Sequence, residues 1–365
     1  MVLHPGNSSY NRPMIKCSQL GPSIVRFCAV LLCFVFLVAN SASAQDVSQI
    51  TAKVQALTPT QIPALILKAE SGDVESQVIL GVAYRFGRGV NRNLPEAAKW
   101  LRKASESGSA AAANDLGVMY QYGNGVPQND IEAVKLFQRA ADLGDAPAQA
   151  NLGFMYTEGR GVRKDLSKAF GWTQKSADQG YAVGEMNLGF LYLEGKGTTP
   201  DFPKGIAVLK KAAEQGLVEA QRRLALAFLG VETPEGDAAA LKWLSTAAEH
   251  GDKKSSALLG ILRDGGRAGP KINSSEDLTM VRAKGEGGDP DAQNQLGAIY
   301  LASSNPVSAY LWFSLLADNS RADSSTRKNA KDTLKLMPKV ALISKEQIAA
   351  AETRLRDWRA HKPSQ

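Results

Sequence analysis

The chain has 365 residues, of which 44% are hydrophobic and 22% are charged, a balance typical of globular proteins that excludes a disordered chain. The formal net charge is +7, but the first 44 residues contain three cations and no acidic residue. The remainder carries 40 Lys and Arg against 36 Asp and Glu, a net charge of +4. This modest excess, with no basic run typical of nucleic-acid binders, predicts no nucleic-acid partner.

The N-terminal segment has the pattern of a secretory signal peptide. Three cations precede an apolar stretch from Phe27 to Ala39, which is followed by Ala42-Ser43-Ala44. The apolar stretch is shorter than the roughly 20 residues that span a bilayer, so a membrane anchor is the weaker alternative. We therefore expect residues 1–44 to be a cleaved signal peptide, with no membrane span afterwards and a periplasmic or secreted location. Met14 is an alternative start.

The cysteines support the same organisation. Cys17, Cys28 and Cys33 all lie within residues 1–44. After cleavage the chain has no cysteine, and hence neither a disulfide nor thiol chemistry in an oxidising compartment. Helix packing must hold the remaining chain together.

A glycine recurs every 36 residues through the middle of the chain, at Gly72, Gly108, Gly144, Gly180 and Gly216. Gly251 and Gly288 continue the series at nearly the same interval. A constant period of this length is the mark of stacked structural repeats. Such arrays present an extended surface to other molecules.

Each period contains two helical segments. Residues 145–156 carry apolar side chains at helical spacing, and the pair Gly159 and Gly161 then interrupts the pattern. Asp165 is placed to cap a second helix, and Gly180 to end it. The sequence therefore predicts one antiparallel helical hairpin for each 36 residues.

Apolar and aromatic residues recur in phase with these glycines. A Leu-Gly pair predicts close helix contact, at Leu80-Gly81, Leu116-Gly117, Leu152-Gly153 and Leu188-Gly189. Aromatic residues follow at Tyr84, Tyr120, Tyr156, Tyr192, Phe228 and Tyr300. A third series, eight residues before each final glycine, comprises Trp100, Leu136, Trp172, Val208, Trp243 and Met280. We interpret these series as core packing rather than as a ligand stack, because aliphatic and aromatic residues interchange.

The unit A-x-x-x-L-G-x-x-Y-x-x-G-x-G-V followed by D-x-x-x-A-x-x-W resembles the Sel-one-like repeat, a relative of the tetratricopeptide repeat. The resemblance covers roughly residues 60–320. It implies an all-α fold, a right-handed α-solenoid of about seven stacked antiparallel helical hairpins. We expect N-terminal capping helices at 45–71, the Sel-one-like repeat solenoid at 72–320 and C-terminal capping helices at 321–365.

Two segments depart from regular repeats. Residues 264–275 are rich in glycine and replace the expected turn; we interpret them as a long loop in a decayed repeat, or alternatively as a hinge. In the C-terminal cap, Ser324–Leu336 predicts a helix broken by Pro338. Ser344 and Gln347 then form a capping box that opens the last helix.

Catalytic and metal-binding patterns are weak. His250 and His361 lie far apart, and His250 fits a helix C-terminus, where a cation is favourable. Ser325 and Lys328 match the S-x-x-K of penicillin-recognising enzymes, but the companion S-D-N and K-T-G motifs are absent. We therefore expect no catalytic residues, no metal and no cofactor.

Residues that vary within the first helix of each repeat are the better candidates for function. In related solenoids, first helices line the concave surface, so exposed variable residues there are candidates for partner contact. They lie six or ten residues after the repeat glycine or at the helix-to-loop junction, and are Asn114, Met186, Arg222, Phe154, Phe190, Phe86 and Tyr122.

The resemblance implies an exported scaffold or adaptor that binds a protein or peptide partner in the bacterial envelope. One alternative is a negative regulator that masks a periplasmic sensor domain. Another is a cell-wall or β-lactam hydrolase, for which no catalytic set is evident. Partner identity and oligomeric state stay open.

Overall fold

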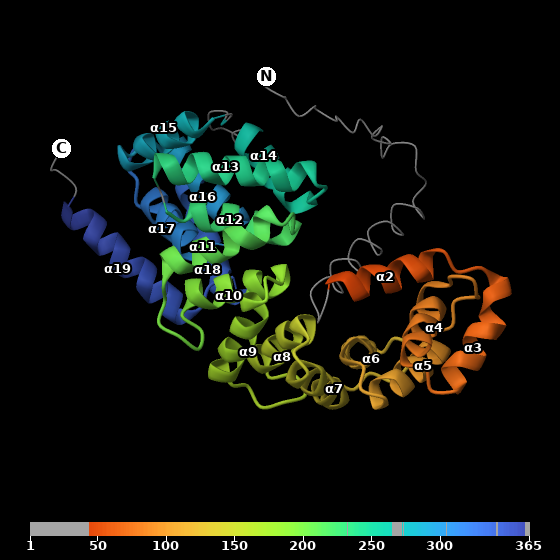
Figure 1. Cartoon of the computed structure of the whole chain (residues 1–365). Coiled ribbons are helices and arrows are strands. Elements are labelled where there is room, and N and C mark those ends of the chain that lie inside the picture. Colours follow the sequence, from red (N-terminus) through yellow and green to blue (C-terminus); the bar gives the residue numbers. More distant parts are fainter. Residues whose placement is uncertain are drawn as a thin grey trace, which may run out of the picture. The chain divides into compact units, whose positions relative to one another are not determined.

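The computed structural model describes residues 44–231, 233–264, 272, 274–303, 305–340 and 342–361. Over these residues the chain consists of helices and connecting turns, without strands (Figure 1). The predicted signal peptide and its three cysteines lie outside the described residues, apart from Ala44. Most of the predicted loop or hinge at 264–275 also lies outside them.

The helices follow one another as antiparallel pairs between terminal caps. The N-terminal cap contains α2 (Ala44–Gln55), the 3-10 helix η2 (Pro59–Gln61) and α3 (Ile62–Glu70). The first helices of the hairpins are α4 (Val74–Phe86), α6 (Ala110–Tyr122), α8 (Ala146–Glu158), α10 (Ala182–Glu194), α12 (Val218–Leu229), α14 (Lys253–Asp264) and α16 (Pro290–Ala302). The second helices are α5 (Leu94–Glu106), α7 (Asp130–Asp142), α9 (Leu166–Asp178), α11 (Phe202–Glu214), α13 (Pro234–Glu249), α15 (Ser275–Glu286) and α17 (Pro306–Ala317). The C-terminal cap contains α18 (Ser324–Lys339) and α19 (Lys345–His361).

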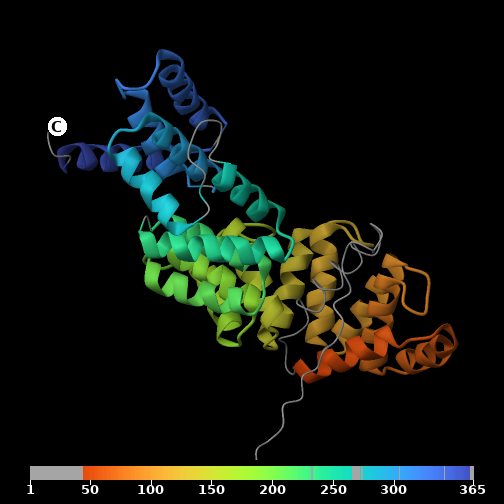
Figure 2. The same cartoon turned by 90° about the horizontal axis from the view of Figure 1, so that it is seen from above.

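Among the described helices, the pairs in close contact include α4–α5, α6–α7, α10–α11, α12–α13 and α16–α17, whereas α15 packs on α13 and α16. Contacts divide the chain into two compact units, with the boundary inside α8. The first comprises Met1–Leu152 and Arg160–Val162, and the second comprises Gly153–Gly159 and Arg163–Gln365. Within the second unit, Figure 2 shows the chain passing from green helices to the blue helices of the C-terminal cap. The prediction had treated residues 72–320 as one array.

The repeated glycine ends the second helix of each hairpin, as predicted. Gly108 has φ 98°, a left-handed conformation that suits a residue without a side chain. Its N–H donates to the Ser105 carbonyl at 2.9 Å, and the Ser109 N–H donates to the Ala104 carbonyl at 2.9 Å. These two bonds form the Schellman end that satisfies the last carbonyls of α5. The other six glycines of the series also have positive φ, namely Gly72, Gly144, Gly180, Gly216, Gly251 and Gly288.

Short polar side chains begin most second helices. Asp165 accepts a bond from the Lys168 N–H at 2.9 Å, which confirms its predicted capping role. Side chains at the equivalent position cap the other second helices, namely Asn93, Asn129, Asp201, Thr233, Ser274 and Asn305. The helix starts are therefore encoded locally and repeat with the chain.

The glycines of the Leu-Gly pairs allow the two helices of a hairpin to touch. A β-carbon on Gly117 would lie 2.7 Å from the Phe137 ring, and one on Gly189 would lie 3.0 Å from the Leu209 β-carbon. The second glycine of the interhelical turn has a different role. A β-carbon on Gly125 would overlap the main chain of Leu94, at the start of the preceding second helix. One glycine therefore closes the hairpin, and the other brings successive hairpins together.

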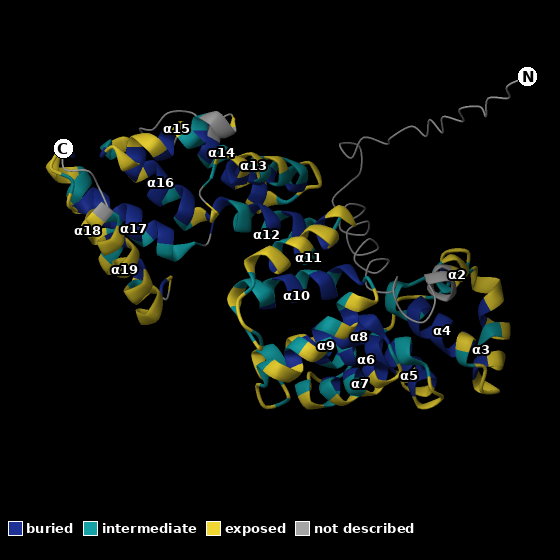
Figure 3. Ribbon diagram, turned by 60° about the vertical axis from the view of Figure 1, so that its left-hand side comes forward, coloured by how far each residue is buried: buried dark blue, intermediate teal, exposed yellow. Residues whose placement is uncertain are grey.

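The predicted third series lies only partly in the core. Trp100 is buried as predicted, and Leu136 and Trp243 pack against buried clusters. Trp172 is half-buried beneath the Lys175 ammonium, 4.0 Å from the ring centroid, and Met280 is 53% exposed. The prediction that Met280 is a core residue was wrong. The next residue in each repeat is buried, namely Leu101, Phe137, Thr173, Leu209, Leu244 and Val281. Figure 3 shows buried and exposed stretches alternating along the helices. One residue is about 100° of helical rotation, enough to move a side chain to the edge of the core.

In every second repeat, a glutamine side chain on the first helix donates a hydrogen bond to the end of the preceding helix. The sequence did not predict this link. Gln149 Nε2 donates to the Ala141 carbonyl at 3.2 Å, from a first helix to the end of the preceding second helix. Equivalent bonds run from Gln77, Gln221 and Gln293 at 3.0–3.1 Å. These four glutamines are spaced 72 residues apart, and Glu185 occupies the same position in an intermediate repeat.

The C-terminal cap corrects one predicted boundary. Helix α18 continues through Pro338 to Lys339. The Val340 N–H still bonds the Leu336 carbonyl at 3.1 Å, and buried Met337 keeps this last turn against the core. The capping box of α19 is confirmed, since Ser344 and Gln347 exchange bonds of 2.9 and 3.2 Å.

Candidate partner-binding face

In the first unit, the predicted candidates lie on α4 and α6. Tyr122, the last residue of α6, is 63% exposed. Phe86, the last residue of α4, is half-buried, and the Arg85 guanidinium lies 5.4 Å from its ring centroid. Asn114 is buried, and its Oδ1 accepts a bond of 2.9 Å from Asn151 Nδ2 on α8. Tyr122 is thus accessible to a partner, whereas Asn114 belongs to a bonded polar row.

That polar row contains an ion pair that sequence reasoning missed. Arg85 Nη1 lies 3.6 Å from Asp115 Oδ1, and both side chains are more than four-fifths buried. Burial raises the pKa of the Asp115 carboxyl, and the Arg85 charge acts in the opposite direction. Asp115 and Asn151 both lie seven residues after a repeat glycine, where the residue type also varies. Variation among repeats, which selected the other candidates, would also have identified Asp115 and Asn151 at this repeat position.

In the second unit, Phe154 and Phe190 occupy the same repeat position, 36 residues apart. Phe154 is 40% exposed. Phe190 is half-buried, and its ring lies 5.1 Å from both the Arg223 guanidinium and the Lys196 ammonium. These distances are within the range of cation–π attraction. Each of these cations also has an acidic partner, Glu194 at 2.6 Å for Lys196 and Glu219 at 2.8 Å for Arg223. Neither Arg223 nor Lys196 was predicted.

Met186 and Arg222 are engaged in packing. Half-buried Met186 contacts the apolar cluster of α10, α11 and α12. Arg222 pairs with Glu219 on its own helix, and its Nε lies 3.4 Å from Asp252 Oδ2 at the start of α14. The position six residues after the repeat glycine therefore faces the next hairpin. At the position ten residues after it, Phe154 is exposed and Phe190 is half-buried, whereas Val82 of the first unit is buried.

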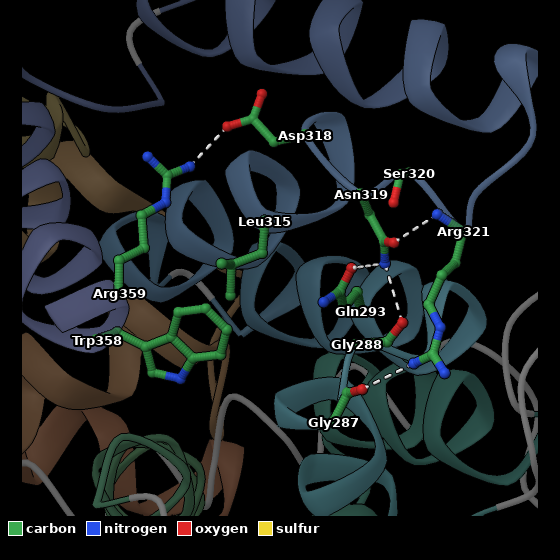
Figure 4. Close-up of a pocket in the computed structure, with 10 residues that line it drawn as sticks. All are labelled: Gly287, Gly288, Gln293, Leu315, Asp318, Asn319, Ser320, Arg321, Trp358 and Arg359. Carbon is green, nitrogen blue, oxygen red and sulfur yellow. Dashed lines mark hydrogen bonds and ion pairs between the residues drawn. The ribbon is translucent and has the colours of Figure 1, made fainter. Parts of the chain in front are cut away.

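A pocket of about 290 Å³ lies in the C-terminal part of the second unit, between the α15–α16 turn, the end of α17 and α19. Leu315 and Trp358 form its apolar side (Figure 4). Arg359 Nη2 and Asp318 Oδ2 pair at 2.6 Å at the rim, where both side chains are about half exposed or more. This pairing neutralises one of the two arginines of the pocket.

The far side of this pocket is a hairpin link. Asn319 Nδ2 donates to the Gly288 carbonyl at 3.1 Å and to Gln293 Oε1 at 2.8 Å (Figure 4). Three repeats earlier, Gln215 makes the same kind of contact with Glu185 at 2.7 Å. The polar groups of the pocket are therefore largely used in holding the array together.

A second pocket, of about 550 Å³, lies in the first unit between α2, α4 and the α5–α6 turn. Lys53 and Glu75 form an ion pair beside it. Within the described ranges, no three His, Cys, Asp or Glu side chains gather as a metal site would require. The described helices are also too short or too polar to cross a bilayer. Ser325 and Lys328 of the S-x-x-K match are both exposed on the first turns of α18.

Comparisons with known proteins agree with the repeat boundaries. The Sel1 repeat model matches residues 74–109, 110–145, 146–181, 182–217, 218–252 and 290–320, which together exceed half of the chain. The unmatched stretch between residues 252 and 290 contains the weak repeat noted in the sequence. No curated protein matches the chain.

Several solved structures are similar to the chain. A Sel1 repeat protein from Oxalobacter formigenes is 28% identical, over 60% of this chain and 89% of that protein, with a TM-score of 0.49. A protective antigen of uropathogenic Escherichia coli strains with an SLR fold is 26% identical over 85% and 76%, with a TM-score of 0.39. Cysteine-rich protein B of Helicobacter pylori is 23% identical over 33% and 86%, with a TM-score of 0.28. On the six matched repeats, the chain belongs to the Sel1 repeat family, whose repeats generally form protein-interaction scaffolds.

Proposed function

We propose that the chain is an exported scaffold that binds a protein or peptide partner in the bacterial envelope through the outward face of its first helices. We name this the first-helix face and define it by Phe154, Phe190 and Arg223 in the second unit. The repeat family supports a protein partner. Export is supported by the signal-peptide pattern of residues 1–44.

The observation that carries this proposal is the arrangement around Phe154 and Phe190. Exposed aromatic rings are costly to leave in water, and aromatic and arginine side chains are enriched where proteins bind one another. Phe190 has Arg223 and Lys196 at its ring, and Phe154 is open to solvent one repeat earlier. Lys196 and Arg223 already have acidic partners in Glu194 and Glu219, so a peptide with apolar side chains fits these two rings best.

The first unit has an exposed aromatic residue of its own. Tyr122 offers an exposed ring with a hydroxyl, which suits a surface that must be wet in the free protein and dry in the complex. The bonded amides of Asn114 and Asn151 and the Arg85–Asp115 pair keep the nearby helices fixed. A surface that is ordered before binding loses less conformational entropy when the partner arrives.

The test is site-specific photocrosslinking in cells with the full-length chain. We expect a photoreactive residue at Phe154 or Phe190 to capture a defined envelope protein. The same residue at Lys210, an exposed position on second helix α11, should capture much less. Equal capture at all three positions, or capture of cytoplasmic proteins alone, would refute the proposal. If the captured protein is the periplasmic part of a membrane sensor, the scaffold acts as the predicted negative regulator.

A further inference from the structure

Positive charge is concentrated in the C-terminal cap. Residues 45–320 carry 29 Lys and Arg against 31 Asp and Glu, whereas residues 321–365 carry 11 against 5. The repeats are therefore slightly acidic, and the cap supplies the whole positive excess of the chain after residue 44. Such an asymmetry within one chain points to an anionic partner for the basic segment.

Helix α18 displays this charge on one side. Lys328, Lys331, Lys335 and Lys339 are all exposed, and their spacing of three or four residues places them along one helical stripe. Ala330 and Met337 are buried on the opposite side, against the core. Within the stripe, Asp332 lies 3.8 Å from Lys335, and both side chains are more than half exposed. The other three lysines carry the net charge of this surface.

Apolar side chains are exposed at the end of the same helix. Leu336, Val340 and Leu342 are 54%, 51% and 47% exposed. The Val340 N–H donates to the Leu336 carbonyl at 3.1 Å, and the Leu342 N–H donates to the Met337 carbonyl at 2.9 Å, so the three residues follow one tight turn. Three large apolar side chains left in water within seven residues form a patch that calls for a partner.

We propose that this cap surface, the lysine stripe of α18 with Leu336, Val340 and Leu342, docks on an anionic phospholipid bilayer. The lysines would lie at the headgroup phosphates, and the three apolar side chains would enter the boundary of the acyl region. A basic face beside exposed leucine and valine is the combination that binds membrane interfaces. Juxtamembrane lysines add to such binding because the lipid surface is negative.

Charge complementarity and these apolar side chains together favour a bilayer over nucleic acid. A nucleic acid would neutralise the lysines, but its phosphate backbone offers no apolar layer for Leu336, Val340 and Leu342. A bilayer surface satisfies both groups at once. The inference is independent of the first-helix face, which lies on other helices.

The test is sedimentation with vesicles, using the chain from Ala44 onward, which contains every described helix and lacks the apolar leader. We expect binding to vesicles of equal parts phosphatidylglycerol and phosphatidylcholine, little binding to phosphatidylcholine alone, and release at high salt. The double variant Lys328→Glu/Lys331→Glu should bind at least tenfold more weakly, since each cation contributes roughly fivefold. Leu336→Ser/Val340→Ser should also weaken binding.

The matched control is Lys135→Glu/Lys210→Glu, which makes the same change in net charge at exposed positions on α7 and α11. Its vesicle binding should stay close to that of the parent. The proposal is overturned if this control loses as much binding as the α18 variant, or if Leu336→Ser/Val340→Ser binds as the parent does. It is also overturned if the chain binds duplex DNA but not the anionic vesicles. Unchanged crosslinking at Phe154 in the α18 variants would separate the two surfaces.

Discussion

Arg282 on α15 and Asp237 on α13 form a two-point ion pair inside the second unit. Arg282 Nη1 lies 2.8 Å from Asp237 Oδ2, and Nη2 lies 2.9 Å from Oδ1. Asp237 is fully buried and Arg282 is 6% exposed. Arg282 also donates to the Tyr300 hydroxyl on α16 at 3.0 Å. The pair thus ties three helices together across the stretch that the Sel1 repeat model does not match.

Removing one member of this pair should be strongly destabilising. Asp237→Ala leaves the Arg282 charge buried without its counterion, and we expect a loss of about 3–5 kcal/mol in the free energy of unfolding. The double variant Asp237→Ala/Arg282→Met should recover much of that loss, because no charge then stays buried. Urea unfolding followed by tryptophan fluorescence measures both.

The matched control for that experiment is Glu214→Gln, which removes an exposed ion pair with Lys210 in the same unit. Exposed pairs contribute little, so its unfolding midpoint should hardly move. If Asp237→Ala and Glu214→Gln shift the midpoint equally, the buried pair has no special role in stability.

The sequence contained a signal for Asp237 but not for its partner. Four residues after the N-cap, other second helices have Ala97, Ala133, Ala169 or Gly205, so an aspartate there indicates a buried acid. Arg282 follows 45 residues later, beyond an irregular segment where the 36-residue register is lost. Local patterns repeat with the hairpin and were predictable, as the glycine ends and caps show. The contact between Asp237 and Arg282 spans a segment that departs from the 36-residue repeat, so it depends on tertiary packing.

The candidate face shows the same limit. Variation among repeats selected residues that do not build the shared fold, and Phe154 and Tyr122 are indeed exposed. The same criterion also selected Asn114 and Met186, whose side chains pack or bond between hairpins. In a single sequence, a residue that varies because its packing neighbours vary cannot be distinguished from a residue that varies because it contacts a partner. Only the positions of adjacent helices separate the two cases.

Replacing Glu185 by glutamine should stabilise the second unit in a pH-dependent way. Burial raises the pKa of the Glu185 carboxyl, against the effects of Lys211 and the bond from Gln215. The folded protein therefore binds the proton more tightly than the unfolded chain. The unfavourable effect of ionised Glu185 is absent below the unfolded pKa and grows as pH rises through the folded pKa.

Glu185→Gln removes that charge and supplies the amide that Gln149 uses to bond the preceding helix at Ala141. We expect a gain of about 1 kcal/mol near neutral pH, the usual net value of such a bond. The gain should shrink below pH 4, where Glu185 is protonated in both states. Thermal unfolding of both proteins at several pH values measures it, with Glu214→Gln as the exposed control. A gain that is the same at every pH would contradict the role assigned to the charge.

Export makes a direct prediction about the N-terminus. We expect signal peptidase to cleave after Ala44, so that Edman sequencing of the mature protein begins at Gln45. Helix α2 begins at Ala44, so this cleavage would leave the N-terminal cap essentially whole. Ala44→Asp should block cleavage, because the site requires a small residue. Ala52→Asp, which introduces the same charge inside α2, should be cleaved normally. Full-length protein in the cytoplasm would contradict export.

Two glycines in helices should respond in opposite ways to substitution by alanine. In Gly117→Ala the new methyl group would lie 2.7 Å from the Phe137 ring, which is fully buried. Overpacking of this kind costs about 1–3 kcal/mol. In Gly171→Ala, on the exposed side of α9, no atom lies within 4 Å of the new methyl group. Alanine there should add about 0.5–1 kcal/mol, because it restricts the unfolded chain and favours the helix.

Urea unfolding followed by tryptophan fluorescence measures both changes. Trp100 lies in the first unit, and Trp172, Trp243, Trp312 and Trp358 lie in the second. Gly171→Ala is the control for Gly117→Ala, since the two variants make the same chemical change within a first and a second helix. If both variants stabilise the protein, helix propensity outweighs contact, and the Leu-Gly pair is not needed for close packing of the hairpin. If Gly117→Ala alone destabilises it, the glycine is retained because the partner helix occupies the space of its side chain.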